Sequence, residues 1–222
     1  MFCRKCKSSC IKNGFQANGK QRYYCRSCKS HQQKTYTYRA YGKGINRAIC
    51  RLLVNSCGIT DIARVLHISK NTVSRRILDM AARIKRPVHN ESNQTYEMDE
   101  LFTKVWGRQC WVSYAINRST RQVMDFAVGK RSRDNLGTVI NTLLGLKPNR
   151  ICTDRLPQYK SLVPDSIHCS ARYRTNRIER LNLNIRNHLK RLSRRTLCYS
   201  KSAIMLEATL RIYFWGHTLS FA

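Results

Sequence analysis

The chain has 222 residues and a formal net charge of +30, and its 42 Lys and Arg residues are spread along the whole length. An excess of this size indicates a polyanionic partner, usually nucleic acid, while a hydrophobic content of 42% excludes a merely disordered basic chain. No apolar run approaches the ~18–20 residues of a membrane span, and neither a secretory signal nor a lipidated or amphipathic anchor is evident, so we expect a cytoplasmic protein without a membrane partner.

Four of the eleven cysteines form two Cys-x-x-Cys pairs, with eighteen residues between the pairs. The four are Cys3, Cys6, Cys25 and Cys28. An odd total argues against a complete disulfide framework, whereas two such pairs can place four thiolates around one tetrahedral zinc ion. Asn13-Gly14 and Asn18-Gly19 supply turns between the pairs. We therefore predict a zinc ribbon over residues 1–34, with Cys10 and His31 as nearby substitutes for a ligand. The alternative is four unrelated reduced thiols.

The segment GITDIARVLHISKNTVSRRIL, residues 58–78, has apolar residues at helical spacing on two successive faces. The first face comprises Ile62, Ala63 and Leu66, and the second Val73 and Ile77. Thr60 and Ser69 stand where each helix needs an N-cap, and the connection LHIS is tight. This pattern predicts a helix-turn-helix in a DNA-binding domain over residues 35–86. Its second helix offers DNA a set of polar and cationic side chains: Lys70, Asn71, Thr72, Ser74, Arg75 and Arg76. An ordinary antiparallel helix pair is the alternative, and the excess of cationic and amide side chains favours DNA.

Beyond a polar, Pro-containing linker at 87–94, the sequence alternates β-rich and helical segments. We predict strands over 95–106, 108–120 and 121–132, a helix that stops at Pro148, a strand over 150–154, another over 166–174, and a helix over 175–192. The first of these helices has apolar residues at Leu136, Val139, Ile140, Leu143 and Leu144, and the second at Ile178, Leu181, Ile185, Leu189 and Leu192. This order is typical of an RNase H-like α/β domain, a mixed sheet flanked by helices, over residues 95–222.

The acids of this domain include one that stands alone in a cationic segment. From Arg172 to Lys201 there are ten Lys or Arg residues and a single acid, Glu179. A surface salt bridge, worth roughly 0.3–0.5 kcal/mol at helix spacing, is the simplest explanation. However, Asp99 lies in the first predicted strand and Asp154 at the end of the fourth, and this fold can bring both close to Glu179. Three carboxylates can hold two Mg²⁺ ions ~3.5–4 Å apart, as phosphoryl transfer on DNA requires.

These residues together resemble the transposases of the insertion-sequence-1 family, which are bacterial DDE enzymes. The resemblance is densest in DELFTKVWGRQCWVSYAINRSTRQVMDFAVGKRS, TDRLPQY and TNRIERLNLNIRNHLKRLSRRTLCYSKS. It implies a zinc ribbon, a helix-turn-helix and an RNase H-like domain with the catalytic triad Asp99, Asp154 and Glu179, holding Mg²⁺ or Mn²⁺. It also implies a DNA-binding role for Arg186, seven positions after Glu179 on the same helix face.

Two positions complicate this assignment. The family usually has Gly directly after the second Asp, where the backbone approaches metal and phosphate closely, and this chain has Arg155. Arg155 can instead grip a phosphate. Glu100 is adjacent to Asp99, and adjacent strand residues face opposite sides of a sheet. The family pattern places the ligand at Asp99.

We expect an enzyme that binds the terminal inverted repeats of an insertion sequence, cuts them and joins them to target DNA. Its partners are then double-stranded DNA and further copies of itself, as a homo-oligomer assembled on DNA and associated with the nucleoid. One alternative is a zinc-ribbon and helix-turn-helix regulator whose C-terminal half only dimerises. Another is an RNase H-like nuclease such as a resolvase. A regulator has no need of three well-placed acids in so basic a chain, which favours the transposase.

Overall fold

The computed structural model describes residues 1–36, 38–89 and 92–219, and the chain forms two compact units, Met1–Gly42 and Lys43–Ala222. The first unit is a small antiparallel sheet in the order β1-β2-β3, with β1 Cys10–Phe15, β2 Gln21–Cys25 and β3 His31–Gln33. Gly19 has φ of 73° in the turn between β1 and β2, a conformation that glycine adopts without steric cost. A 3₁₀ turn, Arg39–Tyr41, follows the sheet.

The second unit begins with three helices, α1 Ile45–Val54, α2 Ile59–Leu66 and α3 Lys70–Arg83. The N-cap predicted at Ser69 is confirmed, since its hydroxyl accepts a hydrogen bond from the Thr72 N–H at 3.1 Å. The cap predicted at Thr60 is wrong. Helix α2 starts one residue before Thr60, and the Asp61 carboxylate accepts from the Gly58 N–H at 3.2 Å. Asp61, in the first turn, therefore bonds back to the backbone N–H of the N-cap residue Gly58, which has no side chain to cap the helix.

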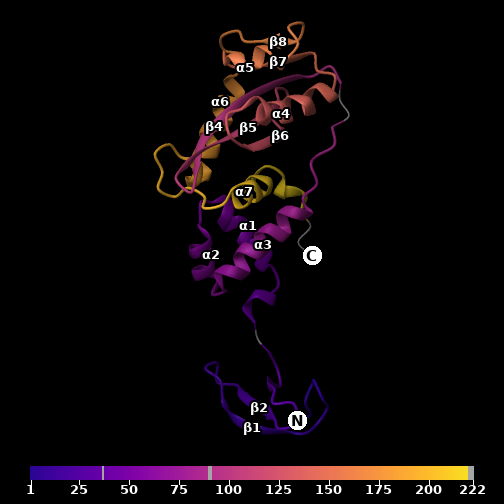
Figure 1. Cartoon of the computed structure of the whole chain (residues 1–222), viewed down its shortest axis with the longest axis vertical. Helices are drawn as coiled ribbons and strands as arrows, with labels where there is room; N and C mark the ends of the chain where they lie inside the picture. The colour runs from indigo at the N-terminus through magenta and orange to yellow at the C-terminus, as the bar shows by residue number, and fades with distance from the viewer. Residues whose placement is uncertain (37, 90–91, 220–222) are drawn as a thin grey trace. The chain divides into compact units, whose positions relative to one another are not determined.

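A five-stranded mixed sheet follows, in the order β6-β5-β4-β7-β8 (Figure 1). Its strands are β4 Thr95–Val105, β5 Arg108–Asn117, β6 Val123–Gly129, β7 Arg150–Cys152 and β8 His168–Cys169. The first three pair antiparallel, while β7 runs parallel to β4 and β8 parallel to β7. The intervening helices are α4 Arg133–Gly145, α5 Pro157–Lys160 and α6 Asn176–His188. The predicted mixed sheet flanked by helices is confirmed.

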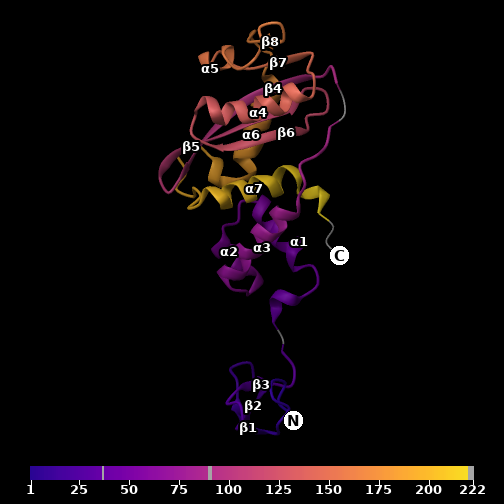
Figure 2. The same cartoon turned by 45° about the vertical axis from the view of Figure 1, so that its right-hand side comes forward.

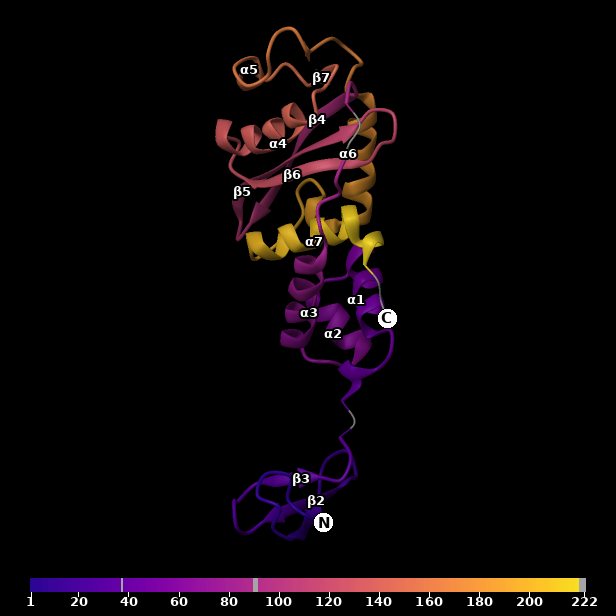
Figure 3. The same cartoon turned by 90° about the vertical axis from the view of Figure 1, so that its right-hand side faces the viewer.

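The two faces of the sheet are covered by different helices (Figure 3). Because successive strand residues alternate sides, Met98 packs with Leu136 and Val139 of α4 in one core cluster. On the other side Tyr114 bonds to α6 through the Ile178 carbonyl and stacks on Phe214 at 5.7 Å between ring centroids. Helix α4 therefore covers one face, and α6 with the last helix, α7 Ala203–Trp215, covers the other.

Helix α7 was not foreseen in the sequence. It packs on β6 and on α1 and α3, so it lies between the sheet and the first three helices (Figure 2). It is apolar nearly all round, and a helix of this kind is buried rather than amphipathic. Within the described residues, none of these helices has the length and apolar character required to span a membrane.

Several predicted elements are longer than the observed ones. The helix predicted to stop at Pro148 ends at Gly145, and the strand predicted over 166–174 is reduced to two residues in β8. The strand predicted over 108–120 ends at Asn117, whose side chain accepts from the N–H groups of two following residues and closes a turn. Helix α6 ends at His188 instead of continuing to 192, because Leu189 adopts an extended conformation. A 3₁₀ turn, Lys190–Leu192, then keeps Leu192 buried.

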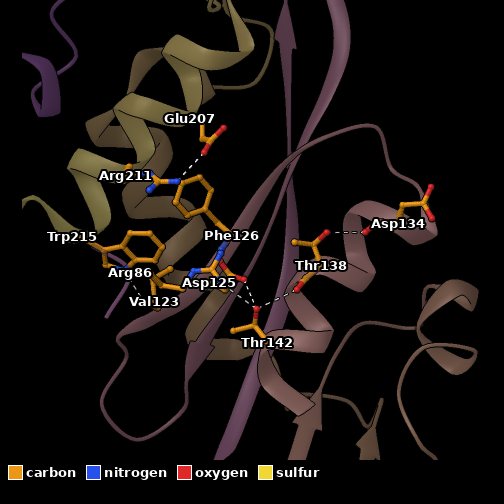
Figure 4. Close-up of polar contacts among 10 residues, drawn as sticks. All are labelled: Arg86, Val123, Asp125, Phe126, Asp134, Thr138, Thr142, Glu207, Arg211 and Trp215. Carbon is orange, nitrogen blue, oxygen red and sulfur yellow. Dashed lines mark hydrogen bonds and ion pairs between the residues drawn. The ribbon is translucent and has the colours of Figure 1, made fainter. Parts of the chain in front are cut away.

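One buried charge on β6 ties the segment after α3 to the sheet (Figure 4). The side chain of Asp125 is 0% exposed and pairs with Arg86 at 2.8 Å. Its other oxygen accepts a 2.6 Å hydrogen bond from the Thr142 hydroxyl of α4. Arg86 also donates to Thr142 at 3.3 Å. A buried carboxylate needs such partners, because an isolated ion in the interior is very costly.

Candidate active site

Three carboxylates meet where β4 extends beyond the end of β7. Strand β7 pairs with β4 only along Thr95–Glu97, so the chain after β7 continues beside the next residues of β4. Asp154, two residues past β7, thereby comes close to Asp99 and Glu100. Carboxylate oxygens of these three residues lie within 4.8 Å of one another.

Asp99 lies on the face of β4 that α6 covers. Its Oδ2 accepts a hydrogen bond from the Asn182 amide at 2.6 Å, and its Oδ1 accepts from the Glu100 N–H at 2.8 Å. Burial, with smaller contributions from the charges of Glu100 and Asp154, raises the pKa of Asp99 to about 6 although those hydrogen bonds oppose the rise. A cation bound here would stabilise the charged form of this buried carboxylate and of the two acids near it.

Glu100 faces the opposite side of β4, as strand alternation requires, yet it reaches the same pocket. Its Oε1 accepts from the Tyr159 hydroxyl of α5 at 2.9 Å, and its Oε2 contacts Arg131 Nη2 at 3.2 Å. The same Arg131 nitrogen lies 3.9 Å from Asp154, and its guanidinium sits 4.6 Å from the centroid of the Trp111 ring. Glu100 is thus part of the carboxylate group, although two neighbours already hold it.

Glu179, in the first turn of α6, lines the same pocket. The pocket has a volume of about 530 Å³ and is lined by Asp99, Glu100, Arg131, Asp154, Thr175, Glu179, Asn182, Arg186 and Arg194. Glu179 stands outside the tight group of three, and its Oε1 accepts from the Thr175 hydroxyl at 2.8 Å. Across residues 1–36, 38–89 and 92–219 no ion pair to Glu179 forms, so the salt-bridge alternative is not realised.

The pocket therefore unites the acids predicted as a triad, together with Arg186. Sequence reasoning missed Arg131, Asn182 and Tyr159. The spacing of Asn182, three residues after Glu179 on the same helix side, is a signal that was available. The other two come from elements whose approach to β4 is set by tertiary packing. Arg155, the departure from the family pattern, does not line this pocket but a neighbouring one of about 530 Å³ on the far side of Asp154.

The donors of this pocket fit a hard divalent cation. Mg²⁺ and Mn²⁺ prefer carboxylate oxygens, and Asp99 and Asp154 present them to a pocket open to solvent. Burial, and to a smaller extent the neighbouring carboxylates, disfavours the charged form of Asp99, and a bound cation offsets both effects.

The four predicted zinc ligands of the first unit also converge. The Sγ atoms of Cys3 and Cys28 are 3.5 Å apart and those of Cys6 and Cys25 are 3.4 Å apart, and all four lie within 4.8 Å of one another. A tetrahedron with Zn–S bonds of ~2.3 Å has edges of roughly 3.8 Å, so the donor set fits zinc. Cys10 and His31, the substitutes, do not belong to this group of four.

The side chains predicted to contact DNA from α3 do not all face solvent. Lys70, Asn71 and Arg75 are exposed and Ser74 is half-buried. Thr72 is only 6% exposed, and its hydroxyl lies 2.8 Å from that of Ser69 in the helix cap. Arg76 is half-buried and donates to the Asn46 side chain of α1 at 2.7 Å.

Comparison with known proteins places this architecture in a family. A family model described as IS1 transposase matches residues 94–219, which include the whole carboxylate pocket. This chain belongs to the IS1 transposase family. The resemblance seen in the sequence is thereby confirmed.

Named relatives agree with this assignment. "Insertion element IS1 4 protein InsB" of Escherichia coli (strain K12) is 35% identical over 119 residues, covering 53% of this chain and 71% of the relative. "Insertion element IS1 protein InsB" of Shigella flexneri is also 35% identical over 119 residues, covering 53% of this chain and 91% of the relative. Among solved structures, a chain of a simian T-cell lymphotropic virus intasome in complex with PP2A regulatory subunit B56 gamma matches with a TM-score of 0.38 and 16% identity, over 72% of this chain and 66% of that chain. So weak a structural similarity supports no conclusion about fold or function.

Proposed function

We propose that this protein is a metal-dependent DNA transposase that cuts the ends of an insertion sequence and joins them to target DNA. The observation that carries the proposal is the pocket that gathers Asp99, Asp154 and Glu179 from three separate elements of an IS1-family chain. Carboxylates and arginines in one open pocket suit a polyanionic substrate that reacts at phosphorus. On this reading the sheet with its flanking helices is an RNase H-like catalytic domain.

Each group in the pocket has a distinct role in this proposal. Asp99, Asp154 and Glu179 hold Mg²⁺ or Mn²⁺, which, when bound, polarises the phosphodiester and lowers the pKa of the attacking oxygen. Arg186 and Arg194 line the same pocket and offset the charge of the phosphate. Hydrolysis of one phosphodiester frees a 3′ hydroxyl, and the joining step exchanges one phosphodiester bond for another. The pocket thus needs no cofactor other than the metal.

The remaining parts are proposed to bring DNA to the pocket. Helices α2 and α3 are joined by a three-residue turn and are assigned as a helix-turn-helix, with Lys70, Asn71 and Arg75 as its exposed contacts. Ser74 and Arg76 are half-buried and lie at the edge of the exposed surface of α3. Thr72 is buried, so we no longer assign it a contact with DNA. Residues 1–34 of the first unit are assigned as a zinc ribbon. A homo-oligomer assembled on DNA would pair the two ends of the element.

The test is cleavage of a supercoiled plasmid that carries candidate element ends, in Mg²⁺ and in EDTA. We expect nicked and joined products only with the metal and only on plasmids that contain the ends. Specific binding to the ends without any strand cleavage in Mg²⁺ or Mn²⁺ would instead favour the regulator. Cleavage of branched DNA in preference to element ends would favour a resolvase.

A further inference from the structure

Glu97 is a fully buried acid on the first strand of the sheet, two residues before Asp99. It is 0% exposed, and its Oε2 accepts hydrogen bonds from the backbone N–H groups of Arg177 and Ile178, each at 3.0 Å. Both N–H groups belong to the first turn of α6. A carboxylate from β4 therefore caps the helix that carries Glu179.

Helix α6 has no cap of its own. Its N-cap residue, Thr175, makes no side-chain cap hydrogen bond, since its hydroxyl donates to Glu179 instead. The first N–H groups of a helix lack partners within the helix, and the helix dipole makes this end attractive to negative charge. Glu97 satisfies two of these groups with a charge of the favourable sign.

A second set of polar contacts, made by Arg118 and Arg177, surrounds Glu97. Arg118, which follows β5, pairs with Glu97 Oε1 at 3.5 Å and donates to the Arg174 carbonyl at 3.1 Å. Arg177 donates in turn to the Arg118 carbonyl. The segment that leads into α6 is thus attached to β4 and to the end of β5 through one buried acid.

Glu97 and Asp99 share a face of β4, because strand residues two apart point the same way. Glu97 holds the start of α6, and Asp99 accepts from Asn182 one turn further along at 2.6 Å. These two attachments fix both the position and the rotation of α6 on β4. They determine where Glu179, which lies between Ile178 and Asn182, stands relative to Asp99.

We propose that Glu97 is a positioning residue that sets the distance between the Glu179 and Asp99 carboxylates, and thereby the affinity of the pocket for a divalent cation. This inference rests on the proposed function of the pocket. Glu97 itself does not line the pocket.

The test uses the full-length protein and compares Glu97→Gln and Glu97→Ala with Asp125→Asn. Asp125 is a second fully buried acid of the same sheet with an Arg partner, and its side chain accepts a hydrogen bond from α4. Glu97→Gln keeps one acceptor oxygen and loses the charge, whereas Glu97→Ala loses both. Three quantities are measured: the Mg²⁺ concentration for half-maximal cleavage, the shift of the melting temperature with added Mg²⁺, and hydrogen exchange of the amides at 177 and 178.

We expect the half-maximal Mg²⁺ concentration to rise about tenfold in Glu97→Gln, the equivalent of ~1.4 kcal/mol, and further in Glu97→Ala. Saturating Mg²⁺ should restore most cleavage, because every ligand is still present. Exchange at 177 and 178 should accelerate in both variants. Asp125→Asn should lower the melting temperature and leave the Mg²⁺ dependence unchanged.

An unchanged Mg²⁺ dependence in Glu97→Gln, with only a lower melting temperature, would overturn the positioning role and leave a structural one. Should Glu97→Ala not fold, Glu97→Gln decides alone. If the wild-type protein cleaved no DNA, the proposed function would fail by itself. The Mg²⁺-induced shift in melting temperature and the amide exchange would still test the role of Glu97.

Discussion

The Thr175 hydroxyl donates a 2.8 Å hydrogen bond to Glu179, four residues further along the chain in the first turn of α6. The only acid among the cationic residues from Arg172 to Lys201 is therefore oriented by a neutral neighbour and not by an arginine. Its position in the first turn also places its charge at the favourable end of the helix dipole. Among the residues that the structure describes, no cationic side chain forms an ion pair with this carboxylate, which lines the same pocket as Asp99 and Asp154.

Glu179→Gln should abolish strand cleavage and joining while leaving DNA binding intact or slightly stronger. The amide keeps the size and the hydrogen bond from Thr175 but loses the charge that a divalent cation needs. Removing one negative charge from a basic surface does not weaken phosphate binding. Plasmid cleavage and gel-shift titration measure the two effects separately.

Glu207→Gln is the matched control, because Glu207 is a half-exposed helical acid that pairs with Arg211 at 3.0 Å (Figure 4) and does not line the pocket. It should cost at most ~1 kcal/mol of stability and cut DNA normally. Asp99→Asn and Asp154→Asn should behave like Glu179→Gln, and the three losses should be far from additive. Wild-type cleavage by Glu179→Gln would remove Glu179 from the site.

The sequence predicted which acids line this pocket better than it predicted how they are arranged in it. The predicted strands placed Asp99 and Asp154, the helical stripe around Ile178 placed Glu179, and the family resemblance singled out these three acids, all of which line the pocket. The approach of Glu100 to the same pocket did not follow, because strand alternation puts it on the other face of β4. It enters the group only because Asp154 lies beyond the short strand β7.

The features that could not be predicted from the sequence are those that depend on tertiary contacts. Helix α7 is apolar on nearly every side, and periodicity therefore gave no amphipathic signal. Helix α6 stops at His188 although the apolar stripe continues to Leu192, since a 3₁₀ turn buries the same residues without the helix. The capping of α6 by Glu97 joins residues about eighty positions apart, which no local pattern encodes.

Tyr159→Phe should lower the free energy of unfolding by roughly 1–3 kcal/mol. The Tyr159 hydroxyl donates to the buried Glu100 carboxylate at 2.9 Å, and its loss leaves that oxygen without this partner. Denaturant unfolding measures the change, with Tyr173→Phe as the control because Tyr173 is largely exposed. Equal stability of the two variants would show that the Tyr159 hydrogen bond contributes nothing to the fold.

Arg75→Ala and Arg76→Ala should differ, although the two residues are adjacent in the sequence. Arg75 is exposed, so its loss should weaken binding to element ends without changing the melting temperature. Arg76 is held by Asn46 at 2.7 Å, so its loss should also lower the melting temperature. Binding to element ends and to random DNA is compared for both. Undiminished binding by Arg75→Ala would take α3 out of the DNA interface.

Removal of zinc should unfold the first unit and spare the second. Apparent binding free energies of structural zinc are ~10–16 kcal/mol, and the three short strands of the first unit offer little core to replace it. Cys25→Ser should abolish zinc binding, whereas Cys198→Ser, at an exposed thiol, should not. Metal analysis and circular dichroism, before and after a chelator, provide the measurement. Purified protein without zinc that retains its N-terminal fold would contradict this prediction.

Arg86→Ala should destabilise the protein by roughly 1–3 kcal/mol at neutral pH, below the 3–5 kcal/mol of a fully buried pair because Arg86 is 48% exposed. The loss leaves Asp125 buried with Thr142 as its main side-chain partner (Figure 4).

Burial already raises the pKa of Asp125, and Arg86 and Thr142 oppose that rise, so removing Arg86 raises the pKa further. A carboxyl with a raised pKa favours folding at low pH and loses that advantage as pH increases through the folded-state value. The deficit relative to wild type should therefore be small near the ordinary Asp pKa of ~4 and grow toward neutrality. Urea unfolding of both proteins across this range measures it, with Arg64→Ala as the control, since its pair with Asp61 is exposed and should cost at most ~1 kcal/mol at any pH. A deficit that shrank as pH rose would show that Asp125 does not carry its charge against Arg86.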